Sequence, residues 1–118
     1  MANSKGQIED EITKAIVQWE KDYLGRGPTE SKTDILRNMV IITLRGVLSK
    51  SEEHLARDKE GMVLVKKLRQ QLVEQGRSEL NEIIKAHTGA NVISLHTDIS
   101  TKTGERIFVF VLDTNLEK

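Results

Sequence analysis

The chain has 118 residues, 37% hydrophobic and 31% charged, so it is long enough for one domain with a single core and too short for two. Its 18 Lys and Arg residues balance 18 Asp and Glu residues, and this zero net charge disfavours non-specific binding to nucleic acid, which depends on neutralising phosphates. The absence of cysteine excludes disulfides, thiolate catalysis and cysteine metal sites.

The N-terminus, "MANSKGQIEDEITKAI", has no continuous apolar run and is not a secretory signal. No stretch approaches the roughly 20 apolar residues that a membrane-spanning helix needs. We therefore expect residues 1–118 to form a single cytoplasmic domain that does not insert into the membrane itself.

The first segment predicts an amphipathic helix. Apolar residues recur at spacings of three and four from Ile8 to Leu24 and form one stripe. Ser4 and Gln7 match a capping box, and Gly25 is a natural C-terminal stop. A turn-rich connector with the only proline, "GRGPTES" (25–31), follows.

The next segment predicts a β-hairpin and a short helix. The apolar runs "TDIL" (33–36) and "MVIITLRGVL" (39–48) flank Arg37-Asn38, and Asn tolerates the positive φ of a tight turn. Ser49 and Glu52 form a second capping box, which starts a helix to about Arg57, and Gly61 is expected to bend or interrupt it.

From Met62 to Gly89 the helical pattern returns, with one face formed by Val65, Leu68, Leu72, Leu80, Ile83, Ile84 and His87. Gly76 inside this helix marks either a kink or a closely packed neighbour. The charged stretches on the helices predict solvated faces: "EKD" (20–22), "EEHLARDKEG" (52–61) and "KKLRQQ" (66–71).

The C-terminal segment predicts a second hairpin, with strands over 91–99 and 105–113 around the turn "TKTG", where Gly104 suits a left-handed position. The order helix, hairpin, helix, hairpin (αββαββ) predicts an α+β two-layer sandwich with helices on one face of a four-stranded antiparallel sheet. The second and fourth strands are apolar on both faces, so we place them centrally. The predicted spatial order is one-two-four-three, a permuted ferredoxin-like sheet.

One face of such a sheet has no helix over it. Because side chains alternate along a strand, the third strand should turn one set toward the helices, namely Ile93, Leu95, Thr97 and Ile99. The uncovered face should hold an apolar centre rimmed by Arg45, His96 and Asp98, with an interface set of Ile41, Thr43, Ile107, Val109 and Val111. Several apolar side chains left in water are a solubility liability, so we predict a homodimer packed sheet on sheet. A different partner protein is the alternative.

Candidate chemistry is sparse. His96 and Asp98 share one strand face, which suits an acid–base couple or half of a metal site, but two ligands do not make a metal site. The set of nucleophile, base and orienting group that catalysis needs is missing, so we predict no catalytic residue, no metal and no cofactor. A second hypothesis is a sensor of anions or small ligands, with a pocket formed by Arg26, Arg45, His96 and Asp98.

A third hypothesis is a nucleic-acid module. The stretch "RIFVFV" (106–111) is similar to the aromatic strand of RNA-recognition motifs, but Ile107 stands where that signature requires glycine. We therefore assign Phe108 and Phe110 to the core or to an interface and expect no nucleic-acid partner.

Four stretches together resemble one bacterial family: "GRGP", "MVIITLRGVLS", "GMVLVKKLRQQL" and "ISLHTDISTKTGERIFVFVLD". It is the MpsC-like family, long known as a domain of unknown function and named for a Na+-translocating, membrane-potential-generating system. The resemblance begins near Ile8, and "HTDISTKTGER" (96–106) is its most specific part. Arg37-Asn38 departs from it, because a Gly-Asp type of turn is expected there.

The resemblance implies a soluble accessory to a membrane ion-transport system, of the Na+/membrane-potential or the inorganic-carbon kind, and carries over no catalytic residues. The leading hypothesis is a non-enzymatic regulatory subunit. It would act as a homodimer, with a membrane transporter as a further partner that holds it at the membrane periphery.

Overall fold

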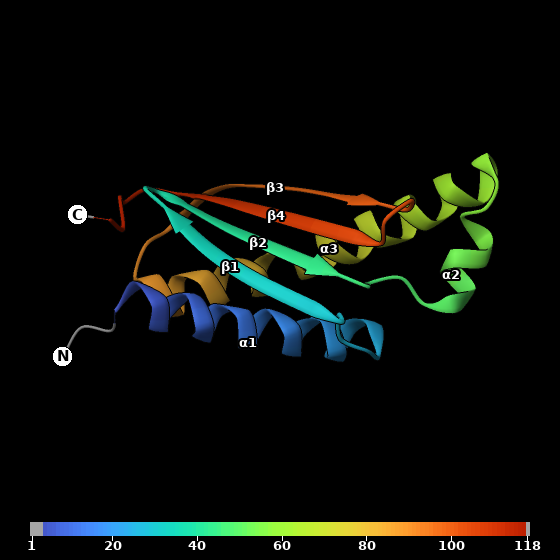
Figure 1. Ribbon diagram of the computed structural model, residues 1–118. Coiled ribbons are helices and arrows are strands. Elements are labelled where there is room, and N and C mark those ends of the chain that lie inside the picture. Colours follow the sequence, from blue (N-terminus) through green and yellow to red (C-terminus); the bar gives the residue numbers. More distant parts are fainter. Residues whose placement is uncertain (1–3, 118) are drawn as a thin grey trace.

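The computed structural model describes residues 4–117, which form a layer of helices against one face of a β-sheet (Figure 1). The elements in chain order are α1 (Lys5–Leu24), β1 (Glu30–Leu36), β2 (Met39–Arg45), α2 (Lys50–Leu55), α3 (Lys59–Thr88), β3 (Val92–Ser100) and β4 (Glu105–Leu112). The predicted α+β architecture is confirmed.

The sheet is antiparallel throughout, and its strand order β1-β2-β4-β3 is the predicted one. α1 and α3 lie under the same face, while α2 and the first turns of α3 project beyond the end of the sheet (Figure 1). The opposite face, here called the open face, has no helix over it in residues 4–117. β2 and β4 occupy the centre because each of them carries apolar residues on both faces.

Both predicted capping boxes form. The Ser4 hydroxyl accepts a hydrogen bond from the backbone N–H of Gln7 (3.2 Å), and the Gln7 side chain accepts one from the Ser4 N–H (2.9 Å). Ser49 and Glu52 repeat this arrangement at the start of α2. Each box satisfies two backbone donors that a helix start leaves unpaired, so helix entry is encoded locally.

The boundary between α2 and α3 differs from the prediction. α2 ends at Leu55, and α3 begins at Lys59 after the N-cap Asp58, whose carboxylate accepts from the Gly61 N–H (2.7 Å). Gly61 therefore lies in the first turn of α3 and does not interrupt a helix. A Cβ at this position would overlap the Leu55 carbonyl oxygen, so glycine permits the two helices to meet closely.

The core lies between the helix layer and the sheet, and its largest fully buried side chains include Ile12, Ile16, Ile42, Leu44, Leu80, Ile84, Phe108 and Phe110. On α3 the prediction that Leu68 faces the core is wrong, because Leu68 is 50% exposed and Arg69 is 3% exposed. Helix geometry explains the difference. Arg69 lies four residues from both Val65 and Val73, and positions four apart share a face.

The first hairpin turn is the predicted Arg37-Asn38, but the positive φ belongs to Arg37 (φ 56°) and not to Asn38. The C-terminal segment holds this turn, since Glu117 accepts a hydrogen bond from the Arg37 N–H and the Leu116 N–H donates to the Arg37 carbonyl (2.9 Å). In the second hairpin, Gly104 adopts the predicted left-handed conformation (φ 72°).

The predicted inward orientation of Ile93 on β3 is wrong. The pairing of β3 with β4 shifts register between Val92 and Ser94, and Ile93 is 66% exposed. A bulge inserts one unpaired residue and reverses the alternation on its far side. Val92 packs against the core in its place, while Leu95 and Ile99 are buried as predicted.

Gly76 lies inside α3 because Trp19 packs directly on it, so that a Cβ would overlap the indole ring. Gly76→Ala should lower the free energy of unfolding by about 1–3 kcal/mol through overpacking, measured by urea denaturation. Gly6→Ala is the matched control, because Gly6 has open space around its Cα and should gain up to about 1 kcal/mol from helix propensity. A stabilising effect at Gly76 would contradict the close contact.

Candidate functional site

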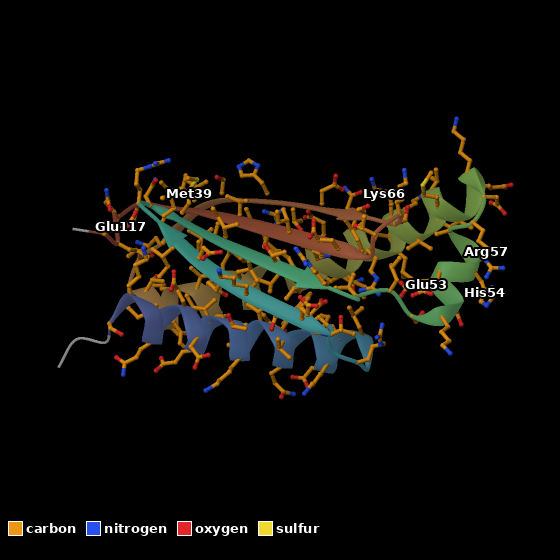
Figure 2. All side chains as sticks on the ribbon, viewed as in Figure 1. Met39, Glu53, His54, Arg57, Lys66 and Glu117 are labelled. Atoms are coloured by element: carbon orange, nitrogen blue, oxygen red, sulfur yellow. The ribbon has the colours of Figure 1, made fainter. Side chains whose placement is uncertain are left out.

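The open face has an apolar centre formed by β2 and β4, which contribute Met39, Ile41, Ile107, Val109 and Val111. Met39 lies opposite Val111 and Ile41 opposite Val109 across the two central strands. Ile107 is 39% exposed, and the other four are half-buried by their neighbours. In Figure 2 the Met39 side chain points away from α1, on the side of the sheet without helices.

Charged residues of the two edge strands flank this centre. The strand register defines two rows across the sheet, which read Asp34–Ile41–Val109–His96 and Lys32–Thr43–Ile107–Asp98. At the end of the face, Arg45 lies between Glu30 (3.8 Å) and Glu105 (3.3 Å). The face is therefore apolar in the middle and charged on both sides.

The four predicted ligand residues lie in three different places. His96 and Asp98 both line a groove between α3 and β3, whereas Arg45 lines a separate depression with Glu30 and Lys32. Arg26 follows α1 and donates a hydrogen bond from Nη1 to the Leu48 carbonyl (2.7 Å). His96 Nε2 and the Ser94 hydroxyl are 3.2 Å apart.

The groove between α3 and β3 has a volume of about 390 Å³. One wall is the side of α3 that carries Lys66, Gln70, Glu74 and Arg77, and the other is β3 from Leu95 to Ile99. Lys66 approaches Asp98 (3.5 Å) across the mouth, and Arg77 binds Glu74 (2.8 Å). Arg106 of β4 also lines the groove, although only 3% of it is exposed.

A buried ion pair joins α2 to α3. Arg69 donates from Nε to Glu52 Oε2 (2.7 Å), from Nη2 to Glu52 Oε1 (2.6 Å) and from Nη2 to the Val47 carbonyl (2.6 Å). Burial alone would raise the pKa of Glu52, but the hydrogen bonds from Arg69 and Ser49 hold it below its usual value. Arg69 Nη1 is buried and has no hydrogen-bond partner in the described chain.

Glu20 on α1 and Arg106 on β4 are two further buried charges. Glu20 is 2% exposed, and burial raises the pKa of its carboxyl despite the opposing fields of Arg69 and Arg106. Burial likewise lowers the pKa of Arg106, whose guanidinium lies 5.4 Å from the centre of the Phe108 ring. Charges from α1, α3 and β4 are thus buried near one another between the helix layer and the sheet, and Glu20 acts on the two arginines through its field.

The prediction that the charged stretches are solvated is wrong for Glu20, Glu52 and Arg69. The sequence does contain a signal for two of them, because Glu20 is four residues after buried Ile16 and Arg69 is four after buried Val65. Arg106 similarly alternates with buried Phe108. Periodicity therefore places Glu20, Arg69 and Arg106 on core faces, whereas their residue types alone predict exposure to solvent.

Residues 4–117 show neither a metal cluster nor a membrane-spanning helix. No three His, Asp or Glu side chains there are grouped so that they would hold a metal ion. No helix in this part of the chain combines the length and the apolar character needed to cross a bilayer.

Comparison with known proteins identifies the family. The family model described as "Na+-translocating membrane potential-generating system (MpsC)" matches residues 4–114, which include every helix and strand described above. The chain belongs to the MpsC family. The match confirms the resemblance seen in the sequence, and it places the open face and the groove within the family domain.

Two relatives of this MpsC chain come from Bacillus subtilis strain 168. The uncharacterized protein YbcI is 53% identical over 118 residues, which cover all of this chain and 95% of that protein. The uncharacterized protein YrhF is 31% identical over 109 residues, or 92% of this chain and 89% of that protein. No solved structure was found that matches this chain.

Breaking the Arg69–Glu52 pair by removing one partner should be strongly destabilising. Arg69→Met leaves the Glu52 carboxylate without its bidentate partner and should cost about 3–5 kcal/mol in urea unfolding. Arg77→Met is the matched control on the same helix, because its pair with Glu74 is exposed and should cost less than about 1 kcal/mol. Equal losses for the two variants would contradict a special role for the buried pair.

Glu20 should make stability depend on pH. Below its ordinary pKa of 4.5 the carboxyl is neutral in both states, so wild type and Glu20→Gln should respond alike to pH. As pH rises, the unfolded carboxyl ionises while burial resists ionisation in the folded state, so wild type should lose stability relative to Glu20→Gln. Melting temperatures measured across this range test the sign, with exposed Glu82→Gln as control. A difference that does not change with pH would contradict it.

Proposed function

We propose that this chain is a non-enzymatic accessory or regulatory subunit of a bacterial membrane ion-transport system and that it acts as a cytoplasmic homodimer through its open face. The family description supports the association with a Na+-translocating system. The main support for the homodimer is the pattern of side chains on the open face, which is self-complementary under a two-fold rotation.

In the dimer that fits this pattern, the two-fold axis runs parallel to the strands. It lies midway between β2 and β4 and halfway between the two stacked sheets. This rotation places β1 of one protomer over β3 of its partner and β2 over β4, with each row of residues kept in step. Such an interface is isologous, so every contact occurs twice. Stacked sheets pack about 10 Å apart and cross at roughly 30°, which long side chains at the edges can span.

The register then predicts which residues meet across the interface. Ile41 faces Val109 of the partner subunit, and Met39 faces Val111 of the partner subunit, so the apolar centres cover each other. At the edges, Lys32 faces the Asp98 carboxylate of the partner subunit, and Asp34 faces the His96 imidazole of the partner subunit, whose ring N–H can donate to a carboxylate. Burial of each large apolar side chain contributes about 1.5–3 kcal/mol, whereas the edge charges mainly set orientation.

The RNA-binding alternative depended on accessible aromatic side chains in β4, and the fold does not provide them. Phe108 and Phe110 are fully buried under the helices and are not presented on the open face. Base stacking needs accessible aromatic rings, so the open face offers bases no platform of the kind that RNA-recognition motifs use.

Light scattering and sedimentation velocity at micromolar concentration test the homodimer. The wild-type chain should sediment as a dimer, and Val109→Asp should yield folded monomer because it places a charge at the apolar centre. The substitution leaves the buried side of β4 unchanged, so circular dichroism should remain as in the wild type. A monomeric wild-type chain would overturn the homodimer and leave the face to a different protein.

A charge exchange tests the orientation of the two sheets. Lys32→Glu and Asp98→Lys should each weaken the dimer by about tenfold through like-charge contacts, and the double variant should recover most of this loss. Lys67→Glu, on the exposed surface of α3, is the control that should leave the dissociation constant unchanged. Additive weakening in the double variant would rule out the proposed two-fold arrangement.

A further inference from the structure

The groove between α3 and β3 is separate from the apolar centre of the open face, and its chemistry points to a ligand of its own. Arg106 lines it from β4 and is almost completely buried. Its Nη1 donates to the Thr97 hydroxyl (2.7 Å), and that hydroxyl in turn donates to the Ile107 carbonyl (2.7 Å). These two bonds fix the position of the guanidinium beside the groove.

The charge of Arg106 is poorly compensated. No ion pair within 4.0 Å joins its guanidinium to a carboxylate of residues 4–117. Glu20 and Asp98 act on it only through their longer-range fields. A guanidinium has five N–H donors, and a buried one without a carboxylate partner is costly, which makes this position favourable for an anion.

Other groups along the groove extend the same chemistry. Lys66 and Arg77 bring two more positive charges from α3, against the carboxylates of Glu74 and Asp98. The carbon side chains of Leu95 and Ile99 form apolar lining, and Gln70 adds an amide that can donate and accept. The lining therefore carries three cations and two carboxylates and has room for a small organic molecule as well as an inorganic ion.

We propose that this groove binds a small oxyanion, a phosphate or carboxylate group free or carried on a small molecule, with Arg106 as its principal ligand. Arg106 presents a planar donor set that matches either group, and Lys66 adds a mobile ammonium at the mouth. Lys66 also contacts Asp98 (3.5 Å), which lies at the edge of the open face. The site needs no second protomer, because all its residues come from one chain, and Asp98 lies both at the groove and at the edge of the proposed dimer interface.

Titration of the wild-type chain with inorganic phosphate, and separately with succinate, tests the site at an ionic strength held constant with NaCl. Saturable changes in amide chemical shifts of residues 95–99, together with a rise in Tm, are expected for at least one probe. Tighter phosphate binding assigns a phosphate-bearing ligand, and tighter succinate binding assigns a carboxylate. Failure of both probes to bind more strongly than chloride overturns the proposal.

Variants decide whether the response belongs to this groove. Arg106→Met should weaken binding at least about tenfold, because it removes a charged hydrogen-bond donor. Lys66→Met should weaken binding several-fold without affecting the fold, since its side chain is half-exposed, and it keeps the test valid if Arg106→Met does not fold. Lys67→Met lies on the same helix outside the groove and should bind as wild type does. Unchanged binding in Lys66→Met, or in folded Arg106→Met, overturns the assignment.

Discussion

A four-stranded sheet has two faces, and in this chain α1 and α3 cover only one of them. The two central strands are apolar on both faces, so burial of Phe108 and Phe110 beneath the helices necessarily turns Val109 and Val111 outward. The hydrophobic effect that builds the core thus also creates an uncovered apolar surface. Charged edge strands on either side confine this surface to the middle of the sheet, which limits how another protein can pack on it.

The buried charges depend on the same two-layer arrangement. Arg69 reaches across from α3 to Glu52 and to the Val47 carbonyl, and so holds α2 against the end of the sheet. Buried ion pairs often contribute little net stability compared with apolar replacements, because both charges lose their hydration. Here the pair connects a short helix that buries no residue of its own, so its effect is to position that helix. Arg106, in contrast, lacks such a partner and faces a groove.

The sequence was informative about local structure and strand order, and less so about which polar residues are buried. The α+β fold and its strand order could be predicted from local features of the sequence. These are the two capping boxes, the Gly104 turn and the two strands that are apolar on both faces. The bulge at Ile93 could not be predicted from the sequence. An inserted residue leaves the pattern of apolar residues looking like that of a regular strand, and only the pairing with the neighbouring strand reveals it. The interface set of Ile41, Thr43, Ile107, Val109 and Val111 lies on the open face, while the four predicted ligand residues occupy separate places.

The sequence by itself determined the elements, the starts of α1 and α2 and the sides of the central strands, because capping, periodicity and alternation act between residues close in the chain. The tertiary structure alone decided that Glu20, Arg69 and Arg106 are buried near one another and that a groove runs between α3 and β3. These features join residues far apart in the chain, and their energies depend on burial and on distances between elements. No local pattern specifies such distances, since they follow from how the helices pack on the sheet.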